Sequence, residues 1–198
     1  MAVTISAERT RGVQPWRRLF HAGNGLVIAF FPPLVGVDRW GVVMIMSVIL
    51  VGLVAFDVAR LRSPRLNALF FRLFPDFASL RERTHVASST WYLCGAVLVY
   101  AMYPTRIAVP SILVLALADP MASVVGRLWG RQKLGKGTVL GSKVFLVIAF
   151  AVLSAYFGPV AAALPALIVA AVEVVPWRLD DNLTVPVACA SALWLLGV

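Results

Sequence analysis

Charged residues are scarce in this sequence, and acidic residues are the scarcest of them. Only 14% of the 198 residues are charged and only nine are Asp or Glu, whereas 61% are hydrophobic. The mean hydropathy of +0.88 is far from the average of soluble proteins. These values exclude a water-soluble globular domain, and they leave helix ends and short loops at the membrane surface as the places where chemistry can occur.

Cysteine is almost absent as well. Cys94 and Cys189 are far apart in the sequence, both lie in apolar runs, and there is no CxxC pattern. A zinc site and a disulfide framework are therefore not expected, and we interpret both thiols as small core side chains.

The sequence is rich in apolar runs of roughly the length that crosses a bilayer. We predict an all-α, polytopic membrane protein with about seven transmembrane helices, in which a basic segment (1–20) precedes a single transmembrane domain (21–198). The runs are 23–37, 40–59, 86–103, 107–126, 139–157, 160–177 and 183–198.

The distribution of Lys and Arg predicts the orientation of these helices. If the N-terminus is cytoplasmic, every Lys and Arg except Arg39 and Arg106 falls in an inner segment, in agreement with the positive-inside rule. The net charge of +9 is therefore a topology signal that favours anionic membrane phospholipids as partners, and it does not indicate nucleic-acid binding. We expect a multi-pass protein of a bacterial cytoplasmic membrane.

Two acidic residues stand inside apolar runs. Asp119 lies in the run 107–126, and Glu173 lies at a similar depth in the run 160–177. A charge near the bilayer centre costs about 2.5–3.5 kcal/mol on insertion scales, so such residues usually face a polar cavity or a partner and mark function. Because Pro120 follows Asp119, we expect the fourth span to be broken there, with Asp119 as the N-cap of its second half.

Further acids gather at the predicted inner mouth. Asp180, Asp181 and Asn182 precede the last run, and Asp57 ends the second. The favoured interpretation of Asp57 is an i,i+3 surface ion pair with Arg60, and one of the two adjacent aspartates could simply cap the last helix. Carboxylates surrounded by Lys and Arg are nevertheless the mixture that holds Mg²⁺ together with a polyphosphate.

A glycine-rich basic loop, GRLWGRQKLGKGTVLGSK, spans residues 126–143. Glycine lets backbone N–H groups approach phosphate and the cations neutralise it, so the loop is a candidate nucleotide cradle. The alternative is that Gly126 and Gly130 form a GxxxG helix contact, while the cations only obey the positive-inside rule. A Walker A motif is excluded because Gly137 occupies the position of its Ser or Thr. The candidate phosphate-binding residues are Gly126, Arg127, Gly130, Lys133, Lys136, Gly141 and Lys143.

Four ordered motifs resemble the CTP-dependent membrane kinases of lipid alcohols, which include dolichol kinase, phytol kinase and CTP-using diacylglycerol kinase. The Asp119 motif is also similar to that of phosphatidate cytidylyltransferases, whereas DDNLTVP resembles the kinases better. One departure is that Lys136 is displaced by one position and Leu140 replaces an acid of the family pattern. The motifs are RRLFHAGNG from Arg17, with its His21; Asp57 with Arg60; DPMASVVGRLWG from Asp119; and EVVPWRLDDNLTVP from Glu173.

The resemblance implies transfer of the γ-phosphoryl group of CTP to the hydroxyl of a membrane lipid alcohol on the cytoplasmic face, with Mg²⁺ as cofactor. It also implies roles for individual residues. The implied metal ligands are Asp119, Asp180 and Asp181; the implied catalytic residues are Asp119 with Glu173 or His21 in a positioning or base role; and Asn182 joins the nucleotide-binding residues.

Two other functions stay open at this point. A cytidylyltransferase would use much the same site to make a CDP-lipid from a lipid phosphate. A transporter could also use a broken span with an acid at membrane depth, although it would not require the glycine-rich loop.

Overall fold

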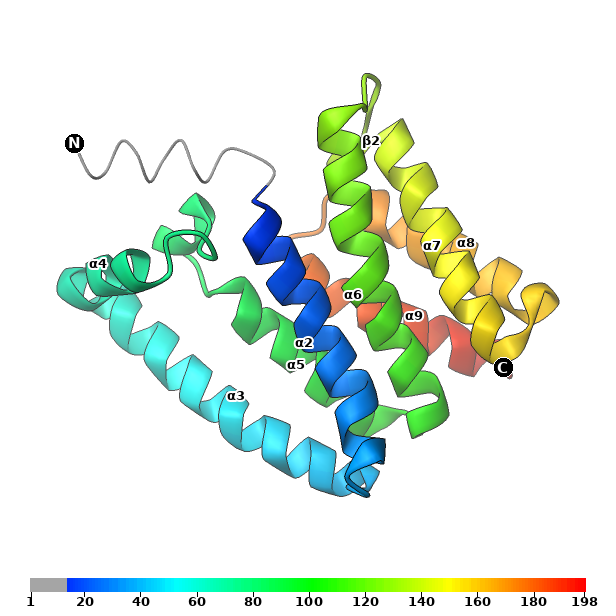
Figure 1. Cartoon of the computed structure of the whole chain (residues 1–198), viewed down its shortest axis with the longest axis horizontal. Coiled ribbons are helices and arrows are strands. Elements are labelled where there is room, and N and C mark those ends of the chain that lie inside the picture. The colour runs from blue at the N-terminus through cyan, green and yellow to red at the C-terminus, as the bar shows by residue number, and fades with distance from the viewer. Residues whose placement is uncertain (1–13) are drawn as a thin grey trace.

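The computed structural model describes residues 14–198 as a bundle of helices (Figure 1). Each of the seven predicted apolar runs overlaps one helix in this part of the chain. Residues 1–13 of the predicted basic segment lie outside the described residues. The helices are α2 (Pro15–Leu34), α3 (Arg39–Arg62), α4 (Pro64–Leu73), the 3₁₀ helix η1 (Leu80–Arg83), α5 (Ser88–Met102), α6 (Thr105–Leu128), α7 (Val139–Phe157), α8 (Pro159–Val174) and α9 (Asp181–Leu195).

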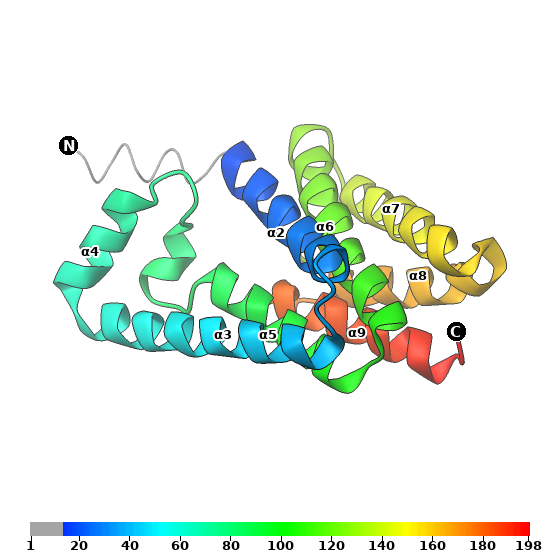
Figure 2. The ribbon, with the colours of Figure 1, turned by 60° about the horizontal axis from the view of Figure 1, so that its bottom comes forward.

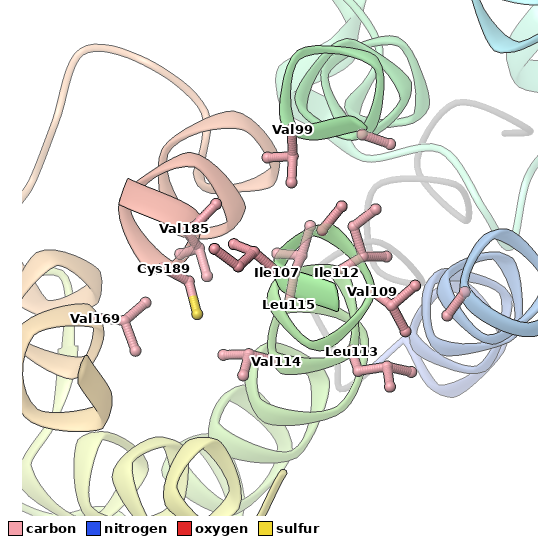
Figure 3. Packing of buried hydrophobic residues seen from close by; sticks show 14 of the residues in the cluster. Val99, Ile107, Val109, Ile112, Leu113, Val114, Leu115, Val169, Val185 and Cys189 are labelled. Carbon is pink, nitrogen blue, oxygen red and sulfur yellow. The ribbon is translucent and has the colours of Figure 1, made fainter. Parts of the chain in front are cut away.

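Helix α6 forms the centre of the bundle. It is apolar around most of its circumference and packs against α2, α5, α7 and α9, which is the arrangement expected of a fully buried helix. Figure 3 shows Val109 and Leu113 of α6 directed toward α2, while Val185 and Cys189 of α9 face α6 from another side. The buried Cys189 confirms the core interpretation of that thiol.

The structure supports an all-α membrane protein. Within residues 14–198, three helices are long and apolar enough to cross a membrane, namely α3, α6 and α7, and α8 is a shorter apolar helix. Helix α3 leaves most of its large apolar side chains exposed, as a lipid-facing helix would. The seven-span topology with a cytoplasmic N-terminus stays a prediction.

The predicted break in the fourth span is wrong. Helix α6 is continuous and contains both Pro110 and Pro120, so Asp119 projects from the middle of a helix and is not an N-cap. Each proline removes only one intrahelical donor, and packing against four neighbouring helices outweighs that loss. Arg18 of α2 also donates a hydrogen bond to the Pro120 carbonyl oxygen at 3.1 Å, which ties α2 to α6 at this point.

The Asp57–Arg60 pair is buried, so its interpretation as a surface pair is also wrong. Nε of Arg60 donates to Oδ1 of Asp57 at 2.6 Å, and the remaining guanidinium nitrogens donate to the carbonyl oxygens of Glu82 and His85 and to Asn67. Arg60 therefore fixes the connection between α4 and α5 onto the end of α3, because two of its four polar partners are carbonyl oxygens of that connection.

Helix α4 lies at one end of the molecule, away from the α6–α8 layer (Figure 2). None of its residues is buried, and it carries Phe70 and Phe71 together with Arg65 and Arg72. This composition is typical of an amphipathic helix at a membrane interface.

A two-stranded antiparallel hairpin connects α6 to α7. Strand β1 (Lys133–Leu134) pairs with β2 (Gly137–Thr138), and the turn contains Gly135 at a positive φ of 52°. The hairpin lies next to the C-terminal end of α6, on the same side of the molecule as the start of α2 (Figure 1).

Candidate active site

Two cavities meet beside the C-terminal half of α6. The first, which we call the arginine cavity, has a volume of about 420 Å³ and lies among the start of α2, η1, the start of α5, α6 and the start of α9. The second, the hairpin cavity, has a volume of about 540 Å³ and lies among α6, the hairpin, α7, the end of α8 and the start of α9. Both are lined by Asp119, Ser123, Arg127 and Asp181, so these four residues form a shared wall.

The structure brings nearly all of the predicted site residues to these cavities, and Lys143 is the exception because it lines neither. The arginine cavity receives His21, Asp180 and Asn182. The hairpin cavity receives Gly126, Gly130, Lys133, Lys136, Gly141 and Glu173. Asp119, Arg127 and Asp181 belong to both. Residues from five separated segments therefore converge on one region, as a single site requires.

The glycines of the loop make close packing possible. A Cβ on Gly126 would lie 2.8 Å from the Oγ1 atom of Thr138, and one on Gly130 would lie 2.3 Å from the same oxygen. The Thr138 hydroxyl also accepts a hydrogen bond from Gly141 N, which caps α7. The two glycines of the GxxxG pattern thus allow the hairpin to approach α6, and Gly126 also meets Gly141 of α7, where an added Cβ would lie 3.3 Å from the Gly141 Cα atom.

Lys136 joins the hairpin to the start of α9. Its Nζ atom forms a salt bridge with Asp181, and its backbone N–H donates to the Val174 carbonyl oxygen at 3.4 Å. The displaced lysine therefore reaches the acidic segment directly. Glu173 lines the same cavity from α8.

Asp180 is the N-cap of α9, which confirms that one of the two adjacent aspartates has a capping role. Its carboxylate accepts from the backbone N–H of Asn182 at 3.2 Å and from the Asn182 side-chain amide at 2.7 Å. Arg81 forms a 3.5 Å salt bridge with Asp180 from the opposite side of the arginine cavity. These contacts fix Asn182, whose amide also donates to the Ser88 carbonyl oxygen.

Glu82 and Ser88 are parts of the site that the sequence analysis missed. Arg17 donates to both, at 3.4 Å to the Glu82 carboxylate and at 2.6 Å to the Ser88 hydroxyl, and Ser88 in turn donates to Glu82. Glu82 also accepts from the backbone of Ser79, which completes a capping box around η1. The spacing Ser79-x-x-Glu82 is the sequence signal that could have identified this turn.

His21 lines the arginine cavity and precedes the predicted apolar run 23–37. Burial, followed by repulsion from Arg17, lowers the pKa of His21 to about 4, so the imidazole is neutral at neutral pH. Its ring packs edge-to-face on Tyr92, with ring centroids 4.5 Å apart. Among the residues that the structure describes, its Nε2 atom is buried and has no hydrogen-bond partner.

Arg18, on the same turn of α2, lies near the shared wall. Burial, then the neighbouring positive charge of Arg127, lowers the pKa of Arg18 to about 10, while the negative charge of Asp119 opposes the shift. Arg18 therefore stays protonated at neutral pH. The arrangement places two guanidinium groups near one carboxylate, which leaves positive charge for an anionic ligand.

Metal binding by the protein alone is not indicated. Within residues 14–198, no three or more His, Cys, Asp and Glu side chains gather closely enough to hold a metal ion by themselves. Mg²⁺ usually binds through one or two carboxylates together with substrate phosphates. Asp119 and Asp181, both on the shared wall, are suitable donors for that mode.

The sequence is similar to two known lipid kinases. The sequence is 30% identical over 193 residues to CTP-dependent diacylglycerol kinase 1 of Schizosaccharomyces pombe, in an alignment that covers 85% of this chain and 88% of the relative. The chain belongs to this family of CTP-dependent lipid kinases. CTP-dependent diacylglycerol kinase 1 of Eremothecium gossypii is 30% identical over 151 residues, which cover 72% of this chain and 47% of that relative. No protein-family model and no solved structure matches the chain.

Membership of this family makes the protein a phosphotransferase with an alcohol acceptor, and it confirms the resemblance to lipid kinases. Neither relative is a dolichol kinase, a phytol kinase or a cytidylyltransferase. Both relatives are fungal, so the bacterial cytoplasmic membrane stays a prediction.

Proposed function

We propose that this protein transfers the γ-phosphoryl group of CTP to the hydroxyl of a membrane lipid alcohol, with diacylglycerol as the first candidate, on the cytoplasmic face of the membrane. The names of the two relatives support the donor and the acceptor. The observation that carries the proposal is the shared wall of the two cavities, because it combines carboxylates and a guanidinium group where two polar cavities meet.

The chemistry of phosphoryl transfer suits this arrangement. The transition state is loose, so catalysis depends mainly on positioning and on neutralising negative charge. Asp119 and Asp181 would hold Mg²⁺ together with phosphate oxygens, with Asp180 nearby. Arg127, Lys133 and Lys136 would neutralise the triphosphate. When bound, the metal would withdraw charge from the β- and γ-phosphates.

One incubation tests the proposal. The detergent-purified full chain is supplied with CTP labelled at the γ-phosphate and with MgCl₂, and diacylglycerol, dolichol, phytol and geranylgeraniol are offered separately. We expect labelled lipid phosphate and CDP in equal amounts with at least one alcohol. A second set of reactions uses α-labelled CTP and a lipid phosphate as acceptor. Labelled CDP-lipid with release of pyrophosphate in that set, and no labelled lipid in the first, would overturn the proposal in favour of a cytidylyltransferase.

A further inference from the structure

The two cavities raise the question of which substrate each one holds. Transfer requires the acceptor oxygen and the γ-phosphorus to approach within a few ångströms along one line. Two cavities that share Asp119, Ser123, Arg127 and Asp181 permit this if each substrate enters from its own side. The residues that are not shared then indicate which substrate belongs where.

Of the two cavities, only the arginine cavity has an aliphatic side chain as large as leucine in its lining. Leu80 lines the arginine cavity, whereas the largest apolar residue in the lining of the hairpin cavity is Ala122. Beside Leu80 in the chain, Phe77 packs edge-to-face on Phe20 of α2 with centroids 5.4 Å apart, and both rings are exposed. An apolar tail can therefore reach the arginine cavity between α2 and η1 while it stays in contact with apolar side chains.

Two of the cations, Arg17 of the arginine cavity and Lys133 of the hairpin cavity, differ in how firmly their side chains are held. Arg17 is fixed by Glu82 and Ser88. The side chain of Lys133 in the hairpin, in contrast, has no hydrogen bond or ion pair with any residue that the structure describes, although its backbone pairs with Thr138. A lysine without a partner can follow the phosphates of a flexible nucleotide as a point charge, whereas a fixed guanidinium group suits one defined position.

The two candidate proton acceptors also lie in different cavities. His21 lines the arginine cavity and Glu173 lines the hairpin cavity. A hydroxyl nucleophile needs a proton acceptor within hydrogen-bond reach. The Nε2 atom of His21, without a partner among the described residues, can take that role, and its packing on Tyr92 fixes the ring.

We infer, on the basis of the proposed kinase function, that the substrates are divided between the cavities: the hairpin cavity binds the triphosphate of the nucleotide, and the arginine cavity binds the headgroup of the lipid alcohol with its hydroxyl beside His21. The hydroxyl oxygen forms a bond to the γ-phosphorus, and its proton passes to Nε2 of His21. The bond from the γ-phosphorus to the β,γ-bridging oxygen breaks, and its electron pair leaves with CDP. Glu173 then belongs to the nucleotide side and is not the base.

Steady-state kinetics with one variant in each cavity and one matched control test this division. Leu80→Ala is expected to raise KM for a short-chain diacylglycerol about tenfold, because an apolar contact to the acceptor is lost, and to leave KM for CTP unchanged. Lys133→Ala is expected to raise KM for CTP about tenfold and to leave KM for the lipid unchanged. Leu134→Ala is the control for Leu80→Ala, since Leu134 is an exposed leucine of the hairpin that lines neither cavity. A Leu80→Ala variant with a raised KM for CTP, or a Leu134→Ala variant with a raised KM for the lipid, would overturn the division.

A binding measurement that needs no turnover provides the second test. The substitutions Leu80→Cys and Gly137→Cys are made separately in a Cys94→Ser background, and modification by a maleimide is timed. Gly137 lines the hairpin cavity, and the nearest atom to an added Cβ there is 3.9 Å away, so the change is tolerated. We expect Mg²⁺–CTP to protect the thiol at position 137 only and short-chain diacylglycerol to protect the thiol at position 80 only. The reverse pattern, joint protection of both thiols by one substrate, or no protection would each contradict the division.

Failure of this inference is distinguishable from failure of the proposed function. If the wild-type chain makes no lipid phosphate from CTP with any alcohol, the proposed function fails. If it makes the product but the KM changes and the protection fall on the wrong substrates, only the division of the cavities is wrong. A His21→Gln variant with unchanged kcat would remove His21 as the base, because loss of a general base costs roughly 10²–10⁴-fold in rate.

Discussion

Arg60→Ala should destabilise the protein more than any other single substitution of a cation on α3. The guanidinium group is fully buried and has four polar partners, of which the Asp57 carboxylate is the only charged one. After the substitution the buried carboxylate keeps hydrogen bonds from Ala87 N at 3.1 Å and Thr90 Oγ1 at 2.6 Å but loses its counter-charge. Breaking a buried pair in this way costs about 3–5 kcal/mol.

The assay is thermal unfolding of the detergent-solubilised full chain at one fixed detergent concentration. For a protein of this size, 1 kcal/mol corresponds to roughly 2–4 °C, so Arg60→Ala is expected to lower Tm by roughly 6–20 °C. Arg62→Ala on the same helix, where the side chain is exposed, is the control and should change stability by about 0.5 kcal/mol or less. Adding Asp57→Asn to Arg60→Ala should restore part of the loss, because no unpaired charge then stays buried. Equal Tm values for the Arg60 and Arg62 variants would refute the buried-pair argument.

Three further predictions concern the site. Asp119→Asn is expected to lower the rate of lipid phosphorylation by about a hundredfold or more while the protein still inserts, because an uncharged amide holds Mg²⁺ with its phosphate less well than a carboxylate does. Initial rates measure this, with EDTA-treated wild type as the reference for lost Mg²⁺. Retained activity would remove Asp119 from the metal site. Lys136→Ala should raise KM for CTP about tenfold, because a proposed contact to phosphate is lost. Lys143 lines neither cavity, so Lys143→Ala should leave KM for CTP unchanged. Equal KM values for the two variants would argue against a phosphate contact of Lys136. Gly126→Ala should lower the free energy of unfolding by about 1–3 kcal/mol, because the added Cβ would lie 2.8 Å from the Oγ1 atom of Thr138 in β2. Gly137→Ala is the control, because an added Cβ there meets nothing closer than 3.9 Å. Similar unfolding temperatures for the two variants would contradict the packing role of Gly126.

Features that depend on local composition could be predicted from the sequence. The apolar runs coincide with helices because hydropathy is a property of a continuous stretch of residues. The convergence of Asp119 and Glu173 could also be predicted, because an acid in an apolar run has few low-energy environments other than a polar cavity.

Features that depend on contacts between distant segments could not. The spacing of Asp57 and Arg60 correctly predicted an ion pair, but only the three-dimensional path of 61–87 buries that pair. The contact between Arg17 and Glu82 joins residues 65 positions apart, so no local pattern indicates it. The GxxxG spacing indicated close approach to Gly126, but it did not identify Thr138 as the partner.

The continuity of α6 is the feature that makes the shared wall possible. Asp119, Ser123 and Arg127 follow one another at intervals of four residues, so an unbroken helix presents all three on one face. A break at Pro120 would have removed this register and separated the carboxylate from the guanidinium group. The proline rule failed because packing against the surrounding helices keeps α6 helical through Pro120, so the acid and the cation proposed to bind metal and phosphate lie about two turns apart on one face. One buried helix thus supplies three of the four residues of the shared wall, and α9 supplies the fourth, Asp181.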